Sequence, residues 1–186
     1  MATSARAVAN EFLRLAEEDG RALTPLQIIK LVYIAHGWML ALYQRPLITD
    51  RIEAWKYGPI IPNLYHDVKG YGAGYIHGLL RDSLSQSLDP QEKNLIHQVY
   101  NIYGRKNGVQ LSELTHRSGT PWHITWRPDA MEVPISNDLI AEHYRRLADA
   151  GSASSKYPSW AHVQSRARRA AQPRSGVAPH PRCIDR

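Results

Sequence analysis

The chain has 186 residues, 43% of them hydrophobic, and it contains five Trp and ten Tyr. This composition excludes disorder along the whole sequence and predicts one domain with a buried core. Cys183 is the only cysteine, which excludes a disulfide within the chain and favours a reducing compartment. The N-terminus lacks the apolar stretch of a secretory signal, and the apolar run 31–42 is too short for a membrane span. We therefore expect a soluble, cytoplasmic protein without a membrane partner.

The net charge of +6 comes from the end of the chain. Residues 1–150 contain 16 Lys and Arg against 16 Asp and Glu, whereas residues 151–186 contain seven basic residues and one acidic residue. We therefore predict a neutral domain over 1–150 and a basic C-terminal tail over 151–186, which is disordered or becomes ordered only on a partner. Arg166, Arg168 and Arg169 are candidates for contacts with nucleic acid or with a partner protein, and the alternative is a solvated extension.

Apolar periodicity and end signals predict seven helices. They span residues 4–18, 25–43, 62–68, 90–103, 109–116, 120–126 and 137–148. The second is apolar nearly all round, which marks the central helix of a bundle, and Gly37 within it implies close approach of a neighbouring element. Residues 52–57, closed by Gly58 and Pro59, and residues 131–135 predict two short strands. The predicted fold class is mainly α: a compact helical domain with a short two-stranded β element and a basic C-terminal tail.

Two aromatic side chains stand beside the predicted turn in residues 55–59, WKYGP. Strand alternation puts Trp55 and Tyr57 on one side and Lys56 on the other. Aromatic residues with polar groups, held on a rigid element, are typical of binding hot spots. The second interpretation is that Trp55 and Tyr57 pack into one core. The pattern fits both interpretations.

Three stretches of the chain resemble one known family. Residues 24–38, TPLQIIKLVYIAHGW, are similar to a motif of the form xLQKLLYxAQGW, with His36 where Gln is common. Residues 46–62, which include EAWKYGPIIP, resemble PLF followed by EAWxyGPVVP. Residues 111–122, LSELTHRSGTPW, are similar to LSxLTHxxxSPW, with Gly119 and Thr120 in place of a simple Ser. The chain thus resembles the Panacea antitoxin domain, which includes SocA-type proteolytic adaptors and many phage-associated proteins, over roughly residues 26–144.

The resemblance implies a mainly helical, non-enzymatic protein that binds and neutralises a protein toxin encoded beside it. In some members of the family the antitoxin also delivers the toxin to a AAA+ protease. The resemblance implies no catalytic residues and no cofactor. Six residues of the matched motifs are candidates for the partner-binding surface: Trp55, Lys56, Tyr57, Tyr65, His116 and Trp122. Lys56 is the preferred candidate for direct contact, because alternation points it away from its two aromatic neighbours.

Other functions have weaker support from the residues. The nine His are scattered without a metal-ligand spacing, so no metal site is predicted, and His116 suits contact with the last carbonyls of its helix. A DNA-binding regulator is the main alternative function, because residues 111–115 and 120–126 resemble a helix-turn-helix. The second of these helices offers only Arg127 to phosphates or bases, so that reading depends on the basic tail.

Overall fold

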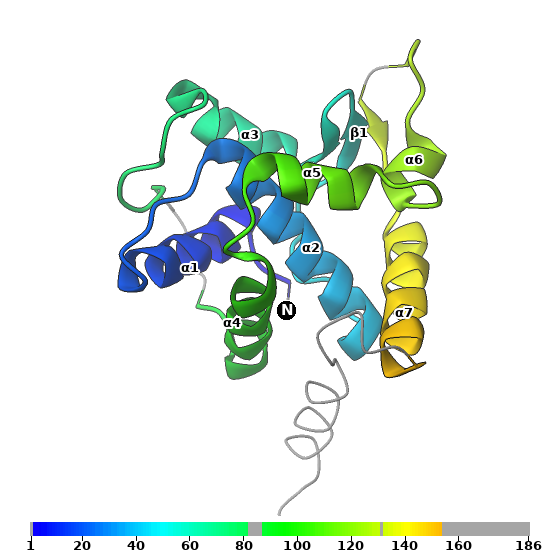
Figure 1. Cartoon of the computed structure of the whole chain (residues 1–186), viewed down its shortest axis with the longest axis horizontal. Helices are drawn as coiled ribbons and strands as arrows, with labels where there is room; N and C mark the ends of the chain where they lie inside the picture. The colour runs from blue at the N-terminus through cyan, green and yellow to red at the C-terminus, as the bar shows by residue number, and fades with distance from the viewer. Residues whose placement is uncertain (1, 82–86, 131, 154–186) are drawn as a thin grey trace, which may run out of the picture.

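The helix α2 (Pro25–Tyr43) forms the centre of the fold in the computed structural model, which describes residues 2–81, 87–130 and 132–153 (Figure 1). Thr24 caps this helix: its side chain accepts from the backbone N–H of Gln27, and the Gln27 side chain accepts from the Thr24 N–H. By length and composition α2 would also pass for a membrane span, but most of it is buried. Its apolar character is therefore that of a core helix.

Four further helices pack directly on α2 and bury it. They are α1 (Ala5–Glu18), α4 (Pro90–Tyr103), α5 (Gly108–His116) and α7 (Asn137–Ala153). Two shorter helices, α3 (Pro62–Val68) and α6 (Pro121–Thr125), and the 3-10 turn η1 (Lys69–Tyr71) complete the helical part of the described chain. The prediction of a mainly α fold is confirmed.

Gly37 of α2 lies directly against the Tyr144 side chain of α7. A Cβ atom at this position would stand 2.2 Å from a ring carbon of Tyr144. The Tyr144 ring is buried and meets Trp38 edge to face, with centroids 5.1 Å apart. The predicted close approach at Gly37 is therefore confirmed, and it fixes α7 against the central helix.

The sheet has three short antiparallel strands, not two. Their order is β2 (Gly58–Ile60), β1 (Glu53–Trp55), β3 (Val133–Pro134). The two predicted strands do pair, but the prediction that strand 52–57 continues through Tyr57 is wrong. The chain turns at Lys56 and Tyr57 and returns as β2. Gly58 and Pro59, interpreted as a strand terminator, belong to that returning strand, where Pro59 is tolerated because β2 lies at the edge.

The end of the last helix differs from the sequence-based expectation. α7 runs five residues past the predicted end at 148, and Ala148 is still buried against the core. α3 ends at Val68 as predicted, and the 3-10 turn η1 follows it, with Gly72 (φ of 55°) as the C-cap. Residues 154–186, including Cys183 and the three tail candidates Arg166, Arg168 and Arg169, lie outside the described residues.

Candidate functional site

The β1–β2 turn is held from beneath by Lys30 of α2. The Lys30 side chain is fully buried, and its Nζ atom donates to the carbonyl oxygens of Tyr57 and Pro59, each at 2.9 Å. Burial lowers the pKa of Lys30 to about 7, because desolvation disfavours the ammonium form. One side chain of the central helix thus satisfies two carbonyls of the turn and the edge strand.

Gly58 makes this arrangement sterically possible. Its φ of 102° is one that L side chains rarely adopt. A Cβ atom there would lie 2.5 Å from Lys30 Nζ and 2.9 Å from Cε1 of His116. Any side chain at this position would separate the turn from the groups that support it.

His116 and Trp122 support the turn from the side. The Nδ1 atom of His116 lies 2.6 Å from the carbonyl oxygen of Ser112, so this nitrogen carries the proton and donates. The His116 ring meets Trp122 edge to face at 4.1 Å. Trp122 Nε1 in turn donates to the carbonyl oxygen of Trp55 at 2.7 Å. The motif around α5 and α6 is thereby tied to the motif around β1.

Trp55 and Tyr65 form a further aromatic pair beside the turn. The Trp55 indole donates to Glu53 at 2.8 Å, and its ring meets that of Tyr65 edge to face at 5.2 Å. Glu53 is buried and also pairs with Arg51 at 3.0 Å. Trp55 and Tyr65 are both half-buried, so each has a packing role as well as an exposed edge.

Lys56 and Tyr57 occupy the tip of the turn and are exposed. The Tyr57 side chain is 71% exposed, and Lys56 Nζ lies 5.6 Å from the centre of the Tyr57 ring. The prediction that alternation separates Lys56 from Tyr57 is wrong, since neither residue lies in a strand. The interpretation that Tyr57 shares a core with Trp55 is wrong because the Tyr57 side chain is exposed.

The structure brings all six candidate residues around this single turn. Four of them, Trp55, Tyr65, His116 and Trp122, are engaged in packing or hydrogen bonds within the fold. Sequence reasoning missed Lys30 and the role of Gly58. Lys30 had a usable signal, because it is the single charged residue in the apolar stretch 26–43. A fully buried lysine is rare unless it is paired.

Within the described ranges, no group of three or more His, Cys, Asp or Glu side chains is arranged to hold a metal ion. The tip of the turn presents the Lys56 cation and the Tyr57 ring on a backbone that buried Lys30 holds.

Comparison with known proteins identifies the family. A family model described as "Antitoxin SocA-like, Panacea domain" matches residues 28–123. A curated relative, Antitoxin SocA of Caulobacter vibrioides (strain NA1000 / CB15N), is 36% identical over 129 residues, which cover 64% of this chain and 69% of the relative. No solved structure matches the chain significantly. The matched segment contains Lys30, the β1–β2 turn, His116 and Trp122, and the chain belongs to the Panacea domain family of SocA-like antitoxins.

Proposed function

We propose that this chain is the antitoxin of a toxin–antitoxin pair and neutralises its toxin by binding it directly, with Lys56 and Tyr57 at the centre of the contact. Membership of the SocA-like family supports the class of partner, a cognate protein toxin. One observation carries the choice of surface: an exposed Lys–Tyr pair stands on a turn whose backbone is fixed by buried groups.

Binding through the tip of the turn should cost little conformational entropy. Association costs conformational entropy when loops become ordered, and a turn that is already fixed loses little of it. Tyr is enriched among residues whose truncation weakens interfaces, because a rigid ring covers a large area. Trp55, Tyr65, His116 and Trp122 are then positioning residues, and Lys56 adds a charge for steering and orientation.

The test is co-expression of the neighbouring toxin gene with variants of this chain. The toxin alone should stop growth, and the natural chain should restore it. Tyr57→Ala should lose rescue and weaken the complex by roughly 30-fold, the size expected for an interface hot spot of about 2 kcal/mol. Tyr75→Ala is the matched control, because Tyr75 is also exposed, at 58%, but lies in a different loop. Equal rescue by both variants would remove the tip from the interface.

Delivery of the toxin to a AAA+ protease is the second part of the proposal, and it rests on the family resemblance. The decisive measurement is the half-life of the toxin in cells with and without this chain. Delivery shortens the half-life, whereas occlusion alone leaves it unchanged. In both cases the proposal assigns the antitoxin and the toxin to the cytoplasm.

The DNA-binding alternative receives less support from the geometry. The second helix of the expected helix-turn-helix, α6, has only five residues, and its Trp122 is buried against the turn. A recognition helix needs an exposed face for base edges. Promoter binding would therefore depend on the tail residues Arg166, Arg168 and Arg169, and it should weaken steeply with salt and vanish when residues 151–186 are deleted.

A further inference from the structure

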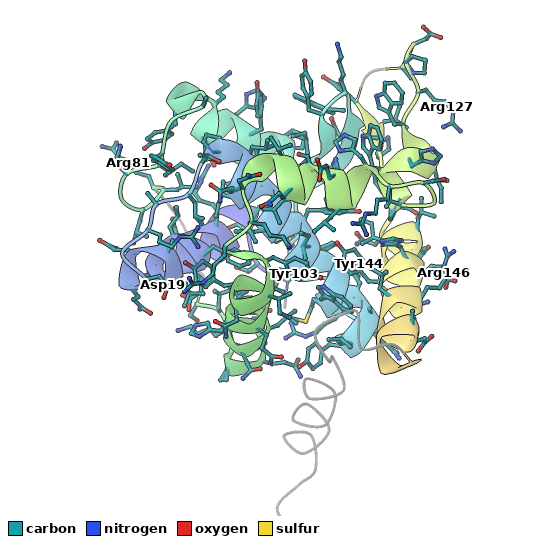
Figure 2. All side chains as sticks on the ribbon, in the orientation of Figure 1. Asp19, Arg81, Tyr103, Arg127, Tyr144 and Arg146 are labelled. Carbon is teal, nitrogen blue, oxygen red and sulfur yellow. The ribbon has the colours of Figure 1, made fainter. Side chains whose placement is uncertain are left out.

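A second surface feature, separate from the β1–β2 turn, lies along α5. It is a groove of about 710 Å³ bordered by α2, the end of α4, the α5–α6 corner and α7. Leu114, Leu147 and Tyr103 contribute half-buried apolar walls, and the buried rings of Tyr33 and Tyr144 lie behind them. Figure 2 shows Tyr103 and Tyr144, which both line the groove, between α4 and α7 below α5. The volume lies within the range of about 300–1,000 Å³ that is typical of ligand-binding clefts.

The charged side chains of the groove all have one sign. Lys106 and Arg117 line it, and none of the described lining residues is acidic. Neither cation forms an ion pair with an acidic side chain in the described ranges of the chain. His143 also lines the groove, and its pKa is lowered by burial and by nearby Arg146, which keeps it neutral at pH 7. The groove therefore combines a largely apolar lining with two cationic side chains and, among the described residues, no acidic one.

We propose that this groove binds a segment of the toxin that carries large apolar side chains flanked by carboxylates. Apolar side chains bury area against the tyrosines and leucines, and carboxylates pair with Lys106 and Arg117. The inference rests on the proposed function and adds the chemistry of the partner to it. Charge disfavours this chain's own tail as the occupant, since residues 151–186 contain seven basic residues against one acidic residue.

The position of the groove suits a role in partner choice. Its α7 wall, with His143, Tyr144 and Leu147, follows the residues 28–123 that match the family domain. Arg117 and Pro121 border the groove, while the adjacent His116 and Trp122 support the turn. A toxin lying across the α5–α6 corner would contact both surfaces, the rigid tip and the basic groove.

The experiment measures the affinity of the full chain for the purified toxin after charge reversal. Lys106→Glu combined with Arg117→Glu should weaken binding at least 10-fold and reduce its dependence on salt. The matched control is Lys69→Glu combined with Arg81→Glu, two exposed cations outside the groove, which should bind like the natural chain. Circular dichroism and thermal melting check that the groove variant and the control variant both fold.

A selection for toxin variants that regain binding to the Lys106→Glu, Arg117→Glu chain provides the second readout. The suppressors should replace acidic residues of the toxin by basic or neutral ones. Unchanged affinity of the groove variant, with a natural chain that still neutralises, overturns this inference and leaves the proposed function standing. A natural chain that does not bind the toxin overturns the proposed function instead. If the Lys106→Glu, Arg117→Glu chain no longer self-associated but still bound the toxin, the groove would be the site for a second copy of this chain. That result would also overturn the inference.

Discussion

The Nζ atom of Lys30 lies 2.9 Å from the carbonyl oxygen of Pro59, so a side chain of the central helix holds the edge strand of the sheet. The same atom reaches the carbonyl of Tyr57 at the tip of the turn. A buried amino group with two backbone acceptors is costly to remove, because the acceptors then lose their donor in a dry environment. The contact thus links the stability of the core to the geometry of the exposed tip.

Lys30→Met should release the turn. It leaves the two carbonyls without a buried donor, and we expect a loss of about 1–3 kcal/mol in the free energy of unfolding. Hydrogen exchange should also become faster in residues 57–60. Urea denaturation and exchange mass spectrometry measure the two effects. Lys69→Met, at an exposed lysine, serves as the control and should change stability by less than about 0.5 kcal/mol. Unchanged exchange in the turn would contradict the role assigned to Lys30.

The contribution of Lys30 should depend on pH. Its pKa is about 7 in the folded chain and 10.5 in its ordinary state, so between these values the unfolded chain binds the additional proton. The free energy of unfolding should therefore rise with pH in this window, by up to about 1.4 kcal/mol per pH unit. The quantity to measure is the natural chain minus Lys30→Met, from urea denaturation at pH 7, 8 and 9. A difference that stays flat or falls over this window would contradict the burial argument.

Gly37→Ala should destabilise the fold even though Ala is the better helix former. The new methyl group would stand 2.2 Å from the buried Tyr144 ring, and such overpacking costs about 1–3 kcal/mol. Gly70→Ala is the control, since nothing lies within 4 Å of a Cβ atom there. Thermal and urea unfolding of the two variants should differ clearly. A higher free energy of unfolding for Gly37→Ala would contradict the close packing of Tyr144 against Gly37.

Trp122→Phe should weaken the link between α6 and β1. The ring remains, but the hydrogen bond from Nε1 to the Trp55 carbonyl is lost, at a cost of about 1–3 kcal/mol. Trp126→Phe is a matched control, because Trp126 stacks on Trp122 at 5.4 Å and is less buried. Chemical denaturation should rank Trp122→Phe below Trp126→Phe in stability. The reverse ranking would show that stacking, and not the hydrogen bond, fixes the corner.

The sequence predicted the helices well because their ends carry local signals. Ser4, Thr24, Asp89 and Thr120 all accept a backbone N–H as N-caps, and Pro follows the last three, so neighbouring residues mark where these helices start. The close approach at Gly37 was also predictable, since Gly in a buried helix requires compensation. These features depend on a few neighbouring residues.

The β1–β2 turn was harder to predict because its geometry depends on distant groups. The alternation of residues 52–57 fits a strand, and the reversal at Lys56 and Tyr57 is stabilised by Lys30, His116 and Trp122 from other elements. The motifs identified which residues gather at the site. They did not separate the supporting residues from the exposed pair, because that distinction depends on burial.

The most direct test of the account is the affinity of the purified chain for the protein encoded by the neighbouring gene, measured by calorimetric titration. We predict a saturable complex that Tyr57→Ala weakens by roughly 30-fold, the effect of a central interface residue worth about 2 kcal/mol. Tyr75→Ala should bind like the natural chain. The absence of a complex, or equal affinities of the Tyr57→Ala and natural chains, would contradict toxin binding through the rigid turn.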